Sequence, residues 1–219
     1  MKLTQNSRNY NPLIIPINKP FSRLNEEDAK EYFDWFISHV DERSDYLSKK
    51  VSESLNLPIE LLDFSMESLI YIWQWFLKVA EINKTPKYIL HNIRKELKAC
   101  GHTKEFIKDT IRQHSLELNV FSRYVIRDIG MYVGKMFVTN FPVLRWDYHT
   151  DTNKDSFANM PQIFGFVDTE YSPPFEPQFE PIYFTEMQAS KLFDKSCSEK
   201  DLYDICILWT KWIPDVGQN

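Results

Sequence analysis

The chain has 219 residues, of which 43% are hydrophobic and 15% aromatic, a content that supports a buried core and excludes a disordered chain. Its formal net charge is -5 and its pI is near 5.6, which disfavours a nucleic-acid-binding protein because phosphate contacts need a concentrated basic surface. No apolar run is long enough to span a bilayer and the first residues lack a signal-peptide core, so the sequence predicts a cytoplasmic protein without membrane contacts.

The three cysteines, Cys100, Cys197 and Cys206, are an odd number and have no C-x-x-C spacing. Neither a disulfide framework nor a zinc site follows from them. The chain also lacks a phosphate-binding loop, since it has no glycine cluster and no G-K-[ST]. We therefore predict no cofactor and no resident metal.

Charge is segregated along the chain. Residues 26–45 hold eight acids against two bases, and residues 84–135 hold eleven Lys or Arg against five acids. Residues 155–190 contain six acids and no Lys or Arg. Two interpretations stay open: these segments neutralise one another within the fold, or one of them forms an exposed docking surface.

The N-terminal part begins with an extended arm and continues into helix. Pro12, Pro16 and Pro20 punctuate the apolar run 13–17, which predicts a short edge strand or an arm. Acids follow Asn25, a capping residue, and apolar residues then recur at spacings of three and four, which predicts an amphipathic helix. A second helix over about 41–55 either follows the first or continues it.

The central part reads as four further helices. Ten of the twelve residues 69–80 are apolar or aromatic, which indicates a helix buried on nearly all sides. Thr85 with Pro86 opens the next helix, and Thr103 begins another one that carries basic residues on its outer face. A long helix over about 117–139 follows, with apolar residues three or four apart.

After Pro142 the pattern changes to strands and loops. Residues 143–149 and 162–167 are predicted strands, and 168–181 is a proline-rich acidic loop. Two helices, at about 182–193 and 199–212, close the chain.

Together these elements predict an α+β, mostly α-helical fold. We expect one domain, 1–219, in which a helical body of about six to eight helices occupies about 24–140. The small antiparallel sheet, the acidic loop and two terminal helices occupy about 141–213, in the C-terminal third.

Gly130 and Gly134 stand one turn apart inside the predicted long helix. A glycine in a helix interior costs about 1 kcal/mol relative to alanine, so a compensating close approach is expected on this face. A neighbouring helix or strand that crosses tightly is the favoured explanation, and a ligand or partner near the backbone is the alternative.

The polar run 147–155 resembles a calcium loop only in part. Asp151, Asn153 and Asp155 occupy the first, third and fifth positions, but Ser156 replaces the required glycine and Gln162 stands where a glutamate belongs. A transition-metal site at this place would have a single histidine. A solvated turn is therefore the better interpretation.

Acids and aromatic residues lie close together in the C-terminal third. Glu170, Glu176 and Glu180 are spread over proline-fixed backbone, which predicts that they are displayed for recognition of a basic partner rather than buried for proton transfer. Tyr171 and Phe175 lie beside them and could act as anchors. The predicted partner-binding residues are Trp146, Asp147, His149, Asp151, Asp155, Glu170, Glu176 and Glu180.

Four short segments carry a resemblance to a family. Residues 29–36 (Ala-Lys-Glu-Tyr-Phe-Asp-Trp-Phe), 128–135 (Asp-Ile-Gly-Met-Tyr-Val-Gly-Lys), 144–146 and 161–166 resemble an uncharacterised bacterial family of cytosolic proteins associated with toxin and immunity systems. In that family a helical body precedes a Gly-x-Tyr-x-Gly-Glu helix and a tryptophan strand. Lys135 stands where the family often has an acid. The resemblance implies an immunity protein and transfers no catalytic residue.

Three functions are consistent with the sequence. The first is a non-enzymatic binding protein, such as an immunity protein that blocks a basic toxin through the acidic region 147–180. The second is a small enzyme with a cleft between the helical body and the sheet, lined by Asp147, His149 and Tyr132. The third is a homodimer in which basic and acidic faces meet.

Overall fold

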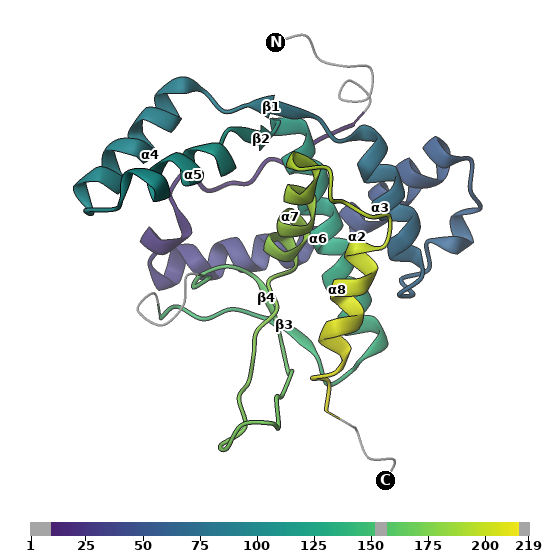
Figure 1. Cartoon of the computed structure of the whole chain (residues 1–219). Helices are drawn as coiled ribbons and strands as arrows, with labels where there is room; N and C mark the ends of the chain where they lie inside the picture. The colour runs from purple at the N-terminus through teal and green to yellow at the C-terminus, as the bar shows by residue number, and fades with distance from the viewer. Residues whose placement is uncertain (1–9, 152–156, 215–219) are drawn as a thin grey trace.

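The computed structural model describes residues 10–151 and 157–214, and Figure 1 shows a mostly helical molecule with two small sheets. Seven α-helices and two antiparallel two-stranded sheets are present in these residues, which confirms the predicted α+β, mostly α-helical class. The elements are α2 (Glu26–Leu55), α3 (Ser68–Val79), β1 (Ile82–Lys84), α4 (Lys87–Ala99), α5 (Lys104–Gln113), β2 (Leu116–Leu118), α6 (Val120–Asn140), β3 (Arg145–Asp147), β4 (Gln162–Phe164), α7 (Pro181–Ser190) and α8 (Asp201–Thr210), with 3-10 turns η1 (Phe21–Arg23), η2 (Ile59–Leu61) and η3 (Lys191–Phe193).

Helix α6 runs through the middle of the molecule (Figure 1). It contacts α2, α3 and α7 on different sides, and its residues Val125, Ile129 and Met136 are fully buried. The Asn119 side chain caps its first turn by accepting a hydrogen bond from the Ser122 amide at 2.7 Å. Because nearly every side of α6 is covered, its packing governs where the other elements lie.

The first predicted helix and the second are one continuous helix, α2. The Asn25 side chain caps its start, accepting from the Asp28 amide at 2.7 Å, and Asn56 ends it in the left-handed conformation with φ of 52°. No break occurs near residue 41, because the buried positions continue at helical spacing through Val40, Leu47 and Val51.

A buried ion pair joins α2 to α6. The Arg43 guanidinium donates from Nε to Asp128 Oδ1 at 3.1 Å, and Asp128 Oδ2 accepts a second bond from Arg43 and one from the Tyr10 hydroxyl. Arg43 also donates to the Asn11 carbonyl at 2.9 Å. The N-terminal arm is held by these contacts and forms no strand at 13–17, so the arm alternative describes the structure.

Both glycines of α6 are sites of close approach, as predicted. A Cβ at Gly130 would lie 2.6 Å from Ile182 Cγ1, and one at Gly134 would lie 1.9 Å from Trp146 Cζ2. The helix thereby brings α7 and β3 against its backbone. A neighbouring helix and strand, rather than a ligand, therefore occupy the glycine face.

The predicted C-terminal sheet is present but small. Strands β3 and β4 pair antiparallel, with Trp146 opposite Ile163, and each has three residues. The predicted strands, 143–149 and 162–167, are longer than the observed ones. Apolar residues continue beyond the paired residues, but the backbone there is irregular.

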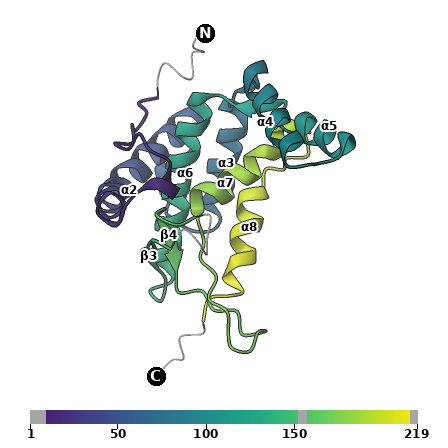
Figure 2. The same cartoon turned by 90° about the vertical axis from the view of Figure 1, so that its left-hand side faces the viewer.

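A second sheet, β1 with β2, was not predicted. It closes the base of the α4–α5 hairpin. The sequence predicts only helices in this part of the chain. Strands of three residues are too short to show a period-two pattern. Both views show the hairpin projecting from the body (Figures 1 and 2), at the end away from the loop that precedes α7.

Substituting Gly134 tests the tight crossing of α6. Gly134→Ala should lower the free energy of unfolding by about 1–3 kcal/mol, because the collision with Trp146 outweighs the gain in helix propensity. Urea unfolding monitored by circular dichroism measures the change. In a Trp146→Ala background the same substitution should become neutral or stabilising; an equal loss in both backgrounds would show that Trp146 does not restrict this position.

Candidate functional site

The acidic loop, residues 168–176, projects between β4 and α7 (Figure 1). Its two ends are joined by backbone hydrogen bonds: the Asp168 amide donates to the Phe175 carbonyl at 2.7 Å, and the Phe175 amide donates to the Asp168 carbonyl at 3.0 Å. The Asp168 carboxylate also accepts from the Glu170 amide at 3.0 Å. The loop therefore has a defined base from which its side chains extend.

Two aromatic rings are exposed on this loop. Tyr171 is 61% exposed and Phe175 is 56% exposed, and their rings meet edge to face with centroids 6.2 Å apart. Glu170 and Glu176 are exposed beside them, and neither forms an ion pair with any residue that the structure describes. The loop thus presents apolar surface and negative charge together.

The prediction that Glu180 is displayed on the acidic surface is wrong, because its side chain is buried and 1% exposed. It is the N-cap of α7, and its Oε2 accepts from the Tyr183 amide. Its Oε1 has no hydrogen-bond partner among the described residues, and burial raises the pKa of the carboxyl to about 8. The contact of Ile182 with Gly130 draws the start of α7 inward, and Glu180 follows it.

Trp146, another predicted partner-binding residue, is half-buried and packs against α6. Its indole lies against the Gly134 backbone and meets the Phe36 ring at 5.2 Å between centroids. The indole Nε1 is buried. The glycine pair is the sequence signal that could have revealed this packing, because glycines inside a helix indicate that a neighbouring group approaches the backbone closely.

The remaining predicted residues lie apart from the acidic loop. Asp147 pairs with Arg145 at 3.5 Å between Oδ2 and Nε, and it accepts from the Tyr148 amide. His149 and Asp151 are half-buried, and the His149 carbonyl accepts from the Asn159 amide at 2.6 Å. Asp155 lies outside the described residues. Of the predicted set, only Glu170 and Glu176 are brought together with exposed aromatic rings.

No metal site is formed by the part of the chain that the structure describes. Within it, no group of three or more His, Cys, Asp or Glu side chains is placed to hold an ion. Asn153 and Asp155 of the partial calcium loop lie outside the described residues.

Tyr132, one of the residues expected to line an enzyme cleft, lies in the core. Tyr132 is fully buried on α6, where its hydroxyl donates to Ser68 Oγ at 2.8 Å and accepts from the Phe64 amide at 3.1 Å. Burial raises its pKa to about 12. Two residues along a helix are about 200° apart, so Tyr132 faces away from Gly134 and the β3 strand that carries Asp147. Tyr132 therefore does not converge with Asp147, the residue of β3 expected to line the same cleft.

Internal neutralisation accounts for part of the segregated charge. Lys135 on α6 lies 3.0 Å from Asp41 and 3.6 Å from Asp45 of α2. The acidic stretch of α2 is thus partly compensated by the basic stretch. Within the described part of the chain, Glu170 and Glu176 of the acidic loop form no ion pair, so internal neutralisation does not extend to them.

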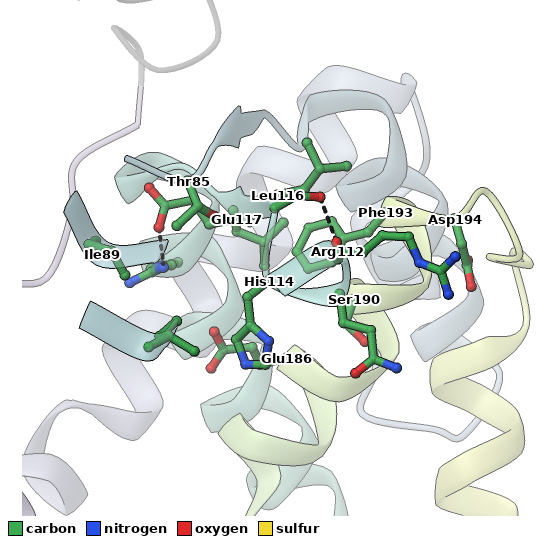
Figure 3. Close-up of a pocket in the computed structure, with 15 residues that line it drawn as sticks. Thr85, Ile89, Arg112, His114, Leu116, Glu117, Glu186, Ser190, Phe193 and Asp194 are labelled. Carbon is green, nitrogen blue, oxygen red and sulfur yellow. Dashed lines mark hydrogen bonds and ion pairs between the residues drawn. The ribbon is translucent and has the colours of Figure 1, made fainter. Parts of the chain in front are cut away.

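A groove near the α4–α5 hairpin is a second candidate site (Figure 3). It has a volume of about 860 Å³ and lies between β2 and the α7–η3 segment, with Ile89 and Ile93 of α4 also lining it. His114 and Glu186 project into it (Figure 3). Sequence reasoning missed this groove, because its walls are separated in the sequence and carry no motif.

Comparison of the chain with protein-family models, with curated proteins and with solved structures finds no match. The resemblance to toxin-associated immunity proteins therefore stays a prediction from the sequence. In the residues that the structure describes, the helices lack the combination of length and apolar character needed to cross a bilayer.

Glu180 makes stability depend on pH. Between an unfolded pKa of 4.5 and a folded pKa of about 8, the native state keeps a proton that the unfolded state has lost. The free energy of unfolding should therefore fall by on the order of a few kcal/mol as pH rises from 5 to 8. Urea unfolding at several pH values should show a shallower fall for Glu180→Gln. The exposed Glu176→Gln is the control, and an unchanged slope in Glu180→Gln would refute the assignment.

Proposed function

We propose that the chain is a non-enzymatic protein-binding module that docks a basic partner through the acidic loop. The observation that supports this most directly is the pair of exposed rings, Tyr171 and Phe175, flanked by the exposed carboxylates of Glu170 and Glu176. Exposed aromatic residues beside charge are typical of the anchors that dominate binding energy. The backbone bonds at the base of the loop favour recognition without a large ordering cost.

The two kinds of side chain have different expected roles. The rings would supply buried apolar area, which mainly slows dissociation, while the carboxylates would steer a positively charged partner and raise the association rate. Steering by exposed charges weakens as salt screens them. An immunity protein that neutralises a basic toxin fits this division, and the sequence resemblance favours that partner.

The proposal places the protein in the cytoplasm. Cys100 is exposed and Cys206 is buried, and all three cysteines are free. Free exposed thiols are common in reducing compartments.

The acidic surface of α2 is a weaker candidate for docking, because Lys135 already pairs with two of its acidic residues, Asp41 and Asp45.

The test begins with a pull-down from a lysate of the source organism, which should yield a basic protein in a stoichiometric complex with the chain. The affinity of that protein for purified variants of the chain is then measured. Tyr171→Ala/Phe175→Ala should weaken binding by about 100-fold or more, since each anchor is expected to contribute about 2 kcal/mol. Glu170→Gln/Glu176→Gln should slow association at low salt and flatten its salt dependence.

Tyr88→Ala is the matched control, because Tyr88 is 68% exposed on α4, far from the acidic loop. It should bind like the wild type. The proposal is wrong if no basic protein forms a stoichiometric complex, or if the complex keeps full affinity when both rings of the loop are removed.

A further inference from the structure

The α4–α5 hairpin projects from the body of the molecule (Figures 1 and 2) and is strongly basic. Residues 84–114 hold eight Lys or Arg and three acids, a local balance of +5 in a chain whose total is -5. The net charge averages over this asymmetry, so it does not exclude a concentrated basic surface on the hairpin.

Helix α4 gathers its bases on one side. Successive residues of a helix are about 100° apart, and at that spacing five residues of α4 fall within an arc of about 100°. These five residues form the basic face of α4: Lys87, His91, Arg94, Lys95 and Lys98. The basic face contains no acid and no apolar residue. Glu96, the one acid of α4, lies about 150° from the middle of the arc.

The basic face is directed into solvent. All five of its residues are exposed, and none of them forms an ion pair with a residue that the structure describes. Ile89 and Ile93, which line the groove, lie on the opposite side of α4. The basic face therefore points away from the groove and is available to a partner.

An exposed aromatic ring borders the basic face. Tyr88 is 68% exposed and lies about 20° around α4 from Lys95. A ring exposed to this extent can stack on an unpaired nucleobase, since every base has a π-face. This side of α4 thus combines cations with aromatic surface.

The composition of the basic face disfavours a membrane or a protein as its partner. A helix that lies on a bilayer directs an apolar side at the lipid, but Ile89 and Ile93 of α4 line the groove instead. The cores of protein–protein interfaces are depleted in lysine, and three of the five residues of the basic face are lysines. Exposed lysine and arginine side chains are, in contrast, the usual contacts to phosphate oxygens.

We propose that the basic face of α4 binds single-stranded nucleic acid. The phosphates contact the four Lys and Arg side chains of that face, and an unpaired base stacks on Tyr88. Such contacts follow the sugar–phosphate backbone and require no particular base sequence. The acidic loop lies at the other end of the molecule (Figure 1), so its carboxylates are kept away from the phosphates. The site does not depend on the function proposed for that loop.

A single strand fits these groups better than a duplex. The bases of a duplex are paired and stacked on one another, so none of them is free to stack on Tyr88. DNA and RNA strands both offer phosphates and unpaired bases, and none of the proposed contacts involves the 2′-hydroxyl. The two kinds of strand should therefore bind with similar affinity.

The probes are fluorescently labelled single strands of about 20 nucleotides, oligothymidylate and oligouridylate, added to the full chain. Fluorescence anisotropy at about 50 mM salt should give a dissociation constant of about 1–100 μM for both strands. The logarithm of the association constant should fall against the logarithm of salt concentration with a slope of about -3. Each phosphate contact of a single strand contributes about -0.7 to that slope, and the basic face has four Lys or Arg.

Lys95→Gln/Lys98→Gln and Lys49→Gln/Lys78→Gln form a matched comparison. Each double variant removes two exposed lysines from a helical surface and changes the net charge equally, but Lys49 lies on α2 and Lys78 on α3. Lys95→Gln/Lys98→Gln should weaken binding by about tenfold or more at about 50 mM salt and reduce the slope to about -1.4. The control variant should change the affinity by less than about twofold.

Tyr88→Ala and Tyr171→Ala separate stacking from a general effect of removing a ring. Both tyrosines are more than half exposed, but Tyr171 belongs to the acidic loop. Tyr88→Ala should weaken binding of the single strands by about fivefold or more and leave binding of a duplex of the same length unchanged. Tyr171→Ala should leave binding of all these probes unchanged, so a failure of this proposal is distinguishable from a failure of the acidic-loop proposal.

The proposal is refuted if neither strand binds at about 50 mM salt, or if the two lysine variants weaken binding equally. It is also refuted if Tyr88→Ala leaves the affinity unchanged while the duplex binds as tightly as the single strands. Polyglutamate that competes as well as an oligonucleotide of equal charge would assign the basic face to an acidic protein, and a salt-sensitive dimer in light scattering would assign it to a second copy of the chain. Circular dichroism shows that each variant is folded, so a loss of binding is attributed to the substituted side chains.

Discussion

The carboxylate of Asp128 lies inside the molecule, 1% exposed, and the guanidinium of Arg43, 3% exposed, lies against it. Removing two charges from water is costly, and the pair is favourable only because the geometry is good and other groups complete the hydrogen bonds. The Tyr10 hydroxyl and the Asn11 carbonyl supply that completion. An unpaired carboxylate at this depth would be strongly destabilising, so α2, α6 and the N-terminal arm have little freedom to shift.

The position of α6 then determines both candidate binding sites. With Asp128 turned toward α2, Gly130 and Gly134 receive Ile182 and Trp146. Trp146 fixes β3 and its partner β4, from which the acidic loop departs, and Ile182 fixes α7, which forms one wall of the groove. Two surfaces at different ends of the molecule thus depend on the same helix.

Much of the helical architecture could be predicted from the sequence, because periodic apolar residues and capping residues act locally. Asn25, Thr103 and the two glycines of α6 behave as their residue types predict. The order of these predicted elements gave the fold class. Local signals failed where the deciding contact is distant: Arg43 and Asp128 are 85 residues apart, and no pattern along the chain joins them.

The candidate sites show the same division. Glu170 and Glu176 are displayed on the proline-rich loop as expected, but Glu180 is carried inward by the packing of α7 on α6. Pro181 marks the start of a helix, but a local pattern does not show how deeply that start is buried. The β1–β2 sheet beside the groove was missed because strands of three residues leave no periodic pattern.

Urea unfolding of Arg43→Met against Lys30→Met tests the central dependence most directly. Lys30 pairs with Asp34 on the exposed side of α2, so both substitutions remove one cation from an ion pair on the same helix. Arg43→Met should lower the free energy of unfolding by about 3–5 kcal/mol, because it leaves Asp128 buried and unpaired. Lys30→Met should leave stability nearly unchanged. Equal stabilities of the two variants would contradict the account, since α6 would then be positioned by something other than this pair.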